Sequence, residues 1–277
     1  MGGCGSSNKN EVGAKPVNSE ELPKYLGKGE APKQIVKAKN PNVKVYDIVY
    51  LFGGSKILQF DTKAKKISNL PVQPSVIPPK RTQCEYIASL DKIVTLGGTQ
   101  DGKISKLAYL WNPKDWSKTT KLPDFPVPIR FTTLAYVDGL IYTIGGETEG
   151  SYPENMLKDV YALRLTPEVG TAWEKITDLP TRRRSTNVMV AGSTIYIFGG
   201  MAEGGPNGTR TTSIDLVDTK TKKSSSDQVR LPLGVEGARM CWVGDDILLI
   251  GGKRDGDKPD SNVLLLDFEK KAIMSLR

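Results

Sequence analysis

Apolar and polar residues alternate along this chain in a repeating unit that ends each time in a pair of glycines. Each pair follows a run of four or five residues rich in β-branched and aromatic side chains, which is typical of a buried β-strand. Successive pairs lie 44, 48, 54 and 52 residues apart, a period that indicates propeller blades and not helix pairs. The five pairs are Gly53-Gly54, Gly97-Gly98, Gly145-Gly146, Gly199-Gly200 and Gly251-Gly252.

The residues around each glycine pair complete the predicted unit. Before the apolar run there is a tight turn and a further apolar run, and an Asp-Gly turn such as Asp138-Gly139 is a strong hairpin signal. After the glycines come a polar loop, a third strand and, in two units, a tryptophan on a fourth strand, Trp116 or Trp173. The predicted third strands are residues 57–60, 107–111, 160–165, 214–217 and 263–266. Four strands per unit make a blade.

On these residues the chain resembles the Kelch repeat, whose signature is a diglycine after the second strand, followed by Tyr and Trp at set offsets. The Tyr position is aliphatic in some units, and the first and fourth units lack the Trp. The resemblance implies an all-β, Kelch-type β-propeller over residues 33–277. Glycine is needed because each strand ends in a sharp bend near the crowded axis, where a side chain would clash or force a positive φ.

The number of blades is less directly determined by the repeat than the fold of each blade. We expect five four-stranded blades, with residues 33–39 as the innermost strand of the first blade and residues 272–276 as the outermost strand of the last. Kelch propellers generally have six blades. An incomplete six-bladed ring, or assembly with another chain, is therefore the alternative.

The connectivity predicts which face of the propeller binds. If the four strands alternate in direction, the loop after each glycine pair and the linker between blades emerge on the same face. Variable loops on a rigid frame commonly carry function. The linkers add arginines to this face, and the predicted binding residues are Arg81, Arg130, Arg183, Arg184 and Arg239.

A ring of arginines around the channel mouth would suit a carboxylate or phosphate, because a guanidinium can donate two hydrogen bonds to either. Some Kelch adaptors bind acidic peptide segments with arginines at this position of the repeat, and the resemblance implies the same chemistry toward a protein partner. The alternative is that these arginines cap strands or pair with loop acids such as Glu147, Glu149 and Asp255.

Composition narrows the chemistry. The net charge of +8 comes mainly from scattered lysine, without the basic stripe and interleaved aromatics of a nucleic-acid reader, so we do not expect nucleic-acid binding. The 277 residues include no histidine, which removes the commonest general base and metal ligand, and we expect no metal or other cofactor. The cysteines Cys4, Cys84 and Cys241 show no metal spacing, and no apolar secretory signal is visible, which favours a reduced, intracellular protein.

The first residues predict lipidation. Residues 1–7, Met-Gly-Gly-Cys-Gly-Ser-Ser, match the N-myristoylation pattern at Gly2, and Cys4 is placed for palmitoylation. One myristoyl chain binds a bilayer only marginally, whereas two chains hold. Residues 1–32 are otherwise Gly, Ser, Asn, Lys and Glu with three prolines, typical of a flexible tether. We expect a lipid-anchored protein on the cytosolic face of a membrane; the alternative is an ordinary disordered terminus that begins with glycine.

Two functions fit these features. The first is a non-catalytic protein–protein interaction module, a Kelch scaffold held at a membrane by its tail. The second is implied by the resemblance, since some Kelch propellers are sugar-acid epimerases: in a sugar-acid epimerase or a lyase-type enzyme, Arg81, Arg130 and Arg184 would hold a substrate carboxylate while a Glu or Tyr moves a proton. Kelch oxidases need a copper site with histidines, which this chain lacks.

Overall fold

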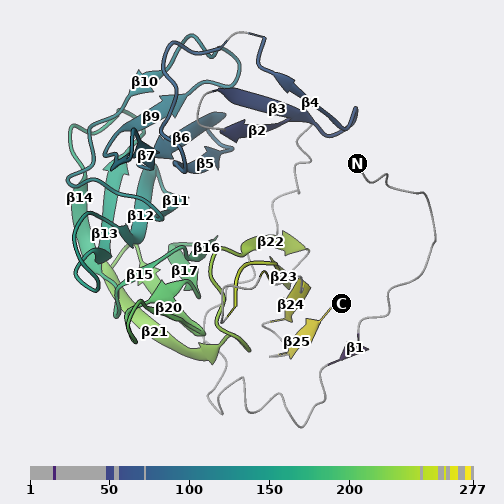
Figure 1. Ribbon diagram of the computed structural model, residues 1–277, viewed down its shortest axis with the longest axis vertical. Helices are drawn as coiled ribbons and strands as arrows, with labels where there is room; N and C mark the ends of the chain where they lie inside the picture. The colour runs from purple at the N-terminus through teal and green to yellow at the C-terminus, as the bar shows by residue number, and fades with distance from the viewer. Residues whose placement is uncertain are drawn as a thin grey trace.

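The computed structural model describes residues 15–16, 48–52, 56–71, 73–243, 246–254, 259, 263–267 and 272–275. Every regular element among them is a β-strand, so the all-β prediction is confirmed. The strands form antiparallel sheets that follow one another around an arc (Figure 1). The described part of the chain contains no helix with the length and apolar character needed to cross a bilayer.

Five of these sheets are the predicted blades, numbered here in chain order. Blade 1 has three described strands, blades 2 to 4 have four each, and blade 5 has a fifth, two-residue strand at its outer edge. The strands of blades 1 and 2 are β2 (Ile48–Phe52), β3 (Ile57–Asp61), β4 (Lys66–Asn69), β5 (Gln83–Ile87), β6 (Lys92–Leu96), β9 (Ala108–Trp111) and β10 (Thr120–Lys121). Those of blades 3 and 4 are β11 (Thr133–Val137), β12 (Leu140–Glu147), β13 (Met156–Arg164), β14 (Glu174–Asp178), β16 (Asn187–Ala191), β17 (Thr194–Phe198), β20 (Ser213–Asp218) and β21 (Lys223–Arg230). Those of blade 5 are β22 (Arg239–Val243), β23 (Asp246–Ile250), β24 (Val263–Asp267), β25 (Ala272–Ser275) and β1 (Lys15–Pro16).

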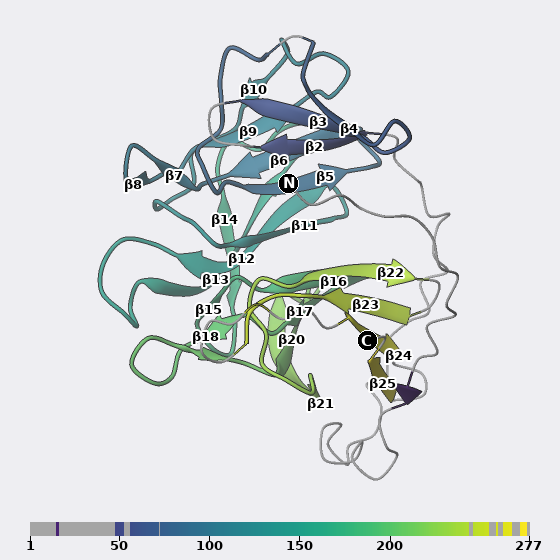
Figure 2. The same cartoon turned by 45° about the vertical axis from the view of Figure 1, so that its right-hand side comes forward.

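The remaining short strands lie on one side of the propeller, beyond the glycine pairs. They form two small sheets, and Figure 2 shows β7, β8, β15 and β18 projecting from this side. The loops and linkers on this side are therefore held in part by backbone pairing. The short strands are β7 (Thr99–Gln100), β8 (Lys103–Ile104), β15 (Arg183–Arg184), β18 (Met201–Ala202) and β19 (Thr209–Arg210).

The predicted strand order is confirmed where the structure describes it. All five predicted third strands are present, as β3, β9, β13, β20 and β24, and the predicted outermost strand of the last blade is β25. The innermost strands β5, β11, β16 and β22 are neighbours in that order. The predicted innermost strand at residues 33–39 and the pair Gly53-Gly54 lie outside the described residues. Blades 1 and 5 stand at the two ends of the arc in Figure 1.

The four described glycine pairs all have positive φ, as predicted. A Cβ on Gly145 would lie 2.3 Å from the carbonyl oxygen of Arg183 in the linker to the next blade. A Cβ on Gly98 would lie 2.5 Å from the carbonyl oxygen of Lys80 in the linker to its own blade. Each pair is thus wedged between two linkers, and only glycine fits both the space and the backbone angle.

Aromatic side chains fill the junctions between the first blades. Tyr50 of β2 packs edge-on against Trp116 with ring centroids 4.9 Å apart. Trp111 is fully buried in the same cluster, and its indole N–H donates to the Thr95 hydroxyl at 2.8 Å. Trp173 packs against Phe125 at the junction of blades 2 and 3, and its N–H donates to the Pro123 carbonyl. Trp116 and Trp173, which the sequence predicts on the fourth strands, lie just before β10 and β14 instead, and they pack at the junctions between neighbouring blades.

Candidate functional site

The interblade linkers and the loops after the glycine pairs share one face, as the connectivity predicts. In each described case the residue that follows the glycine pair forms an antiparallel bridge with the linker that enters the same blade. The bridged pairs are Lys80 with Thr99, Arg130 with Glu147, Arg184 with Met201, and Glu236 with Lys253. This pairing fixes the linker side chains relative to the loops.

The residue after each bridged linker position has a left-handed backbone. These residues are Arg81, Phe131, Ser185 and Gly237, with φ between 54° and 64°. Hydrogen bonds connect them around the axis: the Ser185 N–H donates to the Phe131 carbonyl at 2.8 Å, and the Gly237 N–H donates to the Ser185 carbonyl at 3.1 Å. Arg81 is thus the equivalent of Phe131, whereas Arg130 and Arg184 are equivalent to each other.

Arg130 and Arg184 meet on one carboxylate. The Arg130 Nε donates to Glu147 Oε1 at 3.0 Å, and its Nη2 contacts the same oxygen. The Arg184 Nη1 donates to Glu147 Oε2 at 2.6 Å. Glu147 is 5% exposed, so its charge is shielded by the two arginines, and the cluster carries a net charge of +1.

Phe131 lies beneath both guanidinium groups. The Arg130 and Arg184 Cζ atoms are 5.2 and 5.5 Å from its ring centroid, within the range of a cation–π contact. The ring therefore helps to hold both side chains at the face. We define Arg130, Phe131, Glu147 and Arg184 as the arginine cluster. The two arginine side chains remain 30% and 23% exposed, so solvent or a partner can reach them.

Arg183 points the opposite way, into the protein. Its side chain is 1% exposed, and its Nη2 lies 2.6 Å from the buried Asp215 carboxylate and 2.7 Å from the Ser213 hydroxyl. Its Nη1 donates to the Gly199 carbonyl at 3.3 Å. Burial lowers the pKa of this guanidinium, and Asp215 acts in the opposite direction. The prediction of Arg183 as a binding residue is not supported, because successive residues of strand β15 face opposite sides.

Arg81 and Arg239 are not among the residues that contact Glu147 or Phe131 in the arginine cluster. Both are exposed, and within the described part of the chain neither forms an ion pair. The Arg239 Nη1 makes a long contact of 3.4 Å with the Ala238 carbonyl. The structure therefore brings together two of the five predicted arginines, and the predicted alternative, pairing with Glu147, describes those two.

Further contacts stiffen the rim around the cluster. Tyr152, in the loop of blade 3, donates to the Gly204 carbonyl at 3.1 Å and accepts from the Gly204 N–H at 2.7 Å. Arg210 pairs with Glu236 at 3.3 Å, which links the loop of blade 4 to the next linker. Sequence reasoning missed Phe131 and Tyr152; Phe131 could have been found from its place directly after the linker arginine.

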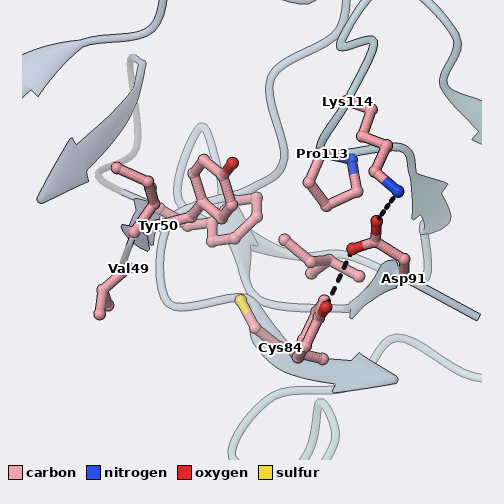
Figure 3. A pocket seen from close by; sticks show the side chains of 10 residues that line it. Val49, Tyr50, Cys84, Asp91, Pro113 and Lys114 are labelled. Atoms are coloured by element: carbon pink, nitrogen blue, oxygen red, sulfur yellow. Dashed lines mark hydrogen bonds and ion pairs between the residues drawn. The ribbon is translucent and has the colours of Figure 1, made fainter. Parts of the chain in front are cut away.

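A cavity of about 530 Å³ lies elsewhere, between blades 1 and 2 (Figure 3). Its polar end is a short relay in which the Tyr86 hydroxyl donates to Asp91 Oδ1 at 2.9 Å and Lys114 Nζ pairs with Asp91 Oδ2 at 2.7 Å. Lys114 and Tyr86 lower the pKa of Asp91. Apolar atoms form most of the wall. The lining residues are Ile48, Val49, Tyr50, Phe52, Cys84, Tyr86, Asp91, Ile93, Pro113 and Lys114.

Cys84 and Glu85 on β5 have shifted pKa values. Burial and the charge of Glu85 raise the pKa of the Cys84 thiol to about 12, although Arg239 opposes this. Burial raises the pKa of the Glu85 carboxyl to about 7. Cys84 is thus a poor nucleophile at neutral pH.

The structure tests neither the predicted lipidation sites nor a metal site that would include residues outside the described ranges. Gly2 and Cys4 lie outside the described residues, so lipidation stays a prediction. Among the described residues no three His, Cys, Asp or Glu side chains gather as a metal site requires.

Comparison with known proteins adds two findings. Residues 40–252 match the KLHDC2/KLHL20/DRC7 Kelch-repeats domain family. The chain is also 30% identical over 142 residues to the N-acetylneuraminate epimerase of Yersinia enterocolitica, and 28% identical over 137 residues to that of Yersinia pestis strain Pestoides F. These matches cover 50% and 47% of this chain but only 34% and 32% of the relatives. The match over most of the chain, together with the glycine-paired blades, shows that this protein belongs to the KLHDC2/KLHL20/DRC7 Kelch-repeats domain family.

Proposed function

We propose that this protein is a non-catalytic scaffold that binds an acidic segment of a protein partner through the arginine cluster and the loops around it. The observation that carries this proposal is the sharing of the Glu147 carboxylate by two arginines. One carboxylate cannot satisfy both guanidinium groups, and an aspartate or glutamate of a partner would add the second. The exposed parts of Arg130 and Arg184 offer the remaining N–H donors.

The surroundings favour a protein ligand. The linker bridges and the contact between Tyr152 and Gly204 hold the loops of blades 3 and 4 in place, so little ordering cost arises on binding. Arginine and aromatic side chains, phenylalanine included, are enriched in the buried centre of protein interfaces, and the cluster supplies both. A partner carboxylate would pair with guanidinium groups that are already oriented by Phe131.

The test is quantitative affinity capture from membranes with three versions of the full chain. The first is the parent, the second carries Arg130→Gln and Arg184→Gln, and the third carries Lys220→Gln and Lys223→Gln. Both lysines are exposed at the β20–β21 turn, on the opposite face, so the third version removes the same charge elsewhere. The proposal expects partners that the first and third versions retain and the second loses. Equal recovery by all three would refute it.

The tail supplies the second part of the proposal, a tether to the cytosolic face of a membrane. Myristate on Gly2 with palmitate on Cys4 would provide the two lipid chains that stable anchoring needs. Fractionation of Gly2→Ala and Cys4→Ser variants tests this directly. We expect both variants to move to the soluble fraction, and variants that partition like the parent would show that the tail is no anchor.

A second candidate function is epimerisation of a sugar acid. It is favoured by the likeness to proteins named N-acetylneuraminate epimerase, which reaches 30% identity over half of this chain. The arginine cluster would then hold the sugar carboxylate. Proton NMR of the anomers of N-acetylneuraminate, with and without the purified protein, separates the two functions. The scaffold proposal expects no acceleration of anomer exchange; acceleration that Arg130→Gln abolishes would favour the enzyme.

A further inference from the structure

The arginine cluster has a charge balance unlike that of the other arginine ion pairs that the structure describes. In those pairs each guanidinium group has a carboxylate of its own: Arg182 with Glu203, Arg183 with Asp215, and Arg210 with Glu236. Arg130 and Arg184 instead share the single carboxylate of Glu147. The cluster is therefore left with one unit of positive charge that no described residue compensates.

Glu147 is held in the cluster by its backbone as well as by its side chain. Its N–H donates to the Arg130 carbonyl at 2.8 Å, and its carbonyl accepts from the Arg130 N–H at 2.9 Å. It is the last residue of β12, and only 5% of it is exposed. The negative charge of Glu147 is thus a fixed part of the site that a ligand meets.

Both arginines keep N–H donors that Glu147 does not use. The Arg130 Nε and Nη2 contact Glu147 Oε1, and no acceptor among the described residues lies against its Nη1. The Arg184 Nη1 donates to Oε2, its Nη2 has no described acceptor, and its Nε is buried without a hydrogen-bond partner in the described part of the chain. The cluster therefore lacks both hydrogen-bond acceptors and one negative charge.

The charge of a ligand decides how well it completes this site. A glutamate or aspartate side chain carries one negative charge at neutral pH, which would neutralise the cluster. A phosphorylated side chain carries about −1.5 to −2 at pH 7, so it would leave excess negative charge beside the buried Glu147. Specific sites reject competing ligands by uncompensated charges of this kind.

We infer that Glu147 is a specificity-determining residue, which makes the arginine cluster select singly charged carboxylates and reject phosphorylated segments. The inference rests on the proposed function, because it names the ligand class of the same site. Without Glu147, Arg130 and Arg184 would form a doubly charged pair of the kind that suits a phosphate. Phosphorylation of the bound segment, which commonly strengthens binding to arginines, would here weaken it.

The test is displacement of a labelled glutamate-rich peptide from the full chain, followed by fluorescence anisotropy. Two unlabelled competitor peptides have the same uncharged sequence around one central residue, which is glutamate in the first and phosphoserine in the second. Each is titrated against the parent, Glu147→Gln and Glu149→Gln. Glu149 is exposed in the same loop, so its variant removes an equal charge without removing a partner of the arginines.

We expect the glutamate peptide to displace the label from the parent and from Glu149→Gln at a concentration about tenfold or more below that of the phosphoserine peptide, because like charges brought together at an interface are strongly unfavourable. In Glu147→Gln the order should reverse. The parent's order in Glu147→Gln would overturn the inference, as would equal displacement, or none, by the two peptides in the parent.

These results are distinguishable from a failure of the proposed function. Binding of the labelled glutamate-rich peptide by the parent, without discrimination between the competitors, would keep the carboxylate site and remove the role of Glu147. No binding of the labelled peptide by the parent would refute the proposed function, and the inference with it.

A second measurement uses the parent alone and covers the case in which Glu147→Gln does not fold. Competitor peptides with a central sulfotyrosine or phosphotyrosine present charged groups of the same tetrahedral shape. The sulfate ester carries one negative charge, whereas the phosphate carries about −1.5 to −2 at pH 7. The inference expects the sulfotyrosine peptide to displace the label at the lower concentration. Equal displacement, or stronger displacement by phosphotyrosine, would contradict it.

Discussion

Arg183 and Arg184 are neighbours in the chain and end in opposite environments. Arg183 is 1% exposed and pairs with Asp215, whereas Arg184 is 23% exposed and shares Glu147 with Arg130. The first pair ties the linker to the β20 strand inside blade 4, and the second lies at the surface of the loop face. The difference teaches that a linker arginine can serve the proposed binding function only where its side chain stays partly exposed, as that of Arg184 does and that of Arg183 does not.

The largest expected effect on stability comes from replacing Arg183, the buried arginine of the two. Arg183→Met leaves the Asp215 carboxylate buried without its partner, and breaking a buried pair in this way costs about 3–5 kcal/mol. Urea unfolding measures the loss. The double variant Arg183→Met, Asp215→Leu is the control, since removing both charges should recover most of the stability. A loss below about 1 kcal/mol in the single variant would show that the pair is not structural.

Glu147→Gln tests the carboxylate at the centre of the arginine cluster. Glutamine keeps one acceptor oxygen but removes the negative charge and turns an NH2 group toward one of the two arginines, so we expect a loss of about 1–3 kcal/mol in the free energy of unfolding. Glu149→Gln is the matched control, because Glu149 is exposed in the same loop and should change little. If both variants unfolded at the same urea concentration, Glu147 would have no organising role.

Glu85 extends the comparison to a charge without an ion-pair partner among the described residues. Burial raises its pKa from 4.5 to about 7, so between these values the folded protein holds a proton that the unfolded chain has released. The free energy of unfolding should therefore fall as the pH rises from 4.5 to 7. Glu85→Gln should remove this part of the pH dependence. An identical pH profile for parent and variant would contradict the assignment.

The smallest stability effects are expected for the exposed arginines. Arg184→Gln leaves Glu147 paired with Arg130 and should cost less than about 1 kcal/mol. Arg81→Gln removes no ion pair with a described residue and should stay within about 0.5 kcal/mol of the parent. Thermal unfolding of both variants checks this order. A larger loss of stability in Arg81→Gln than in Arg184→Gln would contradict the assignment of Arg184, and not Arg81, to the arginine cluster.

Much of the fold could be predicted from the sequence, because the repeat encodes it several times over. Five similar units predict the positive φ of glycine pairs such as Gly145-Gly146, and they also predict the third strand of each blade. Where one unit departs from the pattern, the other four still indicate the position of its strands. The innermost strand of blade 1, which the sequence predicts at residues 33–39, lies outside the described residues.

The candidate site could be predicted only in outline. The alternating strand directions predicted that the linkers and the loops after the glycine pairs share one face of the propeller. The bridges between linkers and loops confirm this arrangement. Which arginines meet did not follow, because one residue of register decides it: Arg81 is equivalent to Phe131, and Arg183 turns inward while Arg184 turns outward. The sequence suggested Glu147 as a possible partner of the arginines. It did not decide between arginines paired with loop acids and a ring of unpaired arginines around the channel mouth.

The central claim is that Arg130 and Arg184 retain capacity for a partner carboxylate. Fluorescence anisotropy with a labelled glutamate-rich peptide tests it most directly, using the parent, the Arg130→Gln, Arg184→Gln protein and the Lys220→Gln, Lys223→Gln control. The account predicts binding that weakens about tenfold or more in the arginine variant, because charged hydrogen bonds are lost, and is unchanged in the lysine variant. Equal affinity in all three proteins, or no binding by the parent, would contradict it.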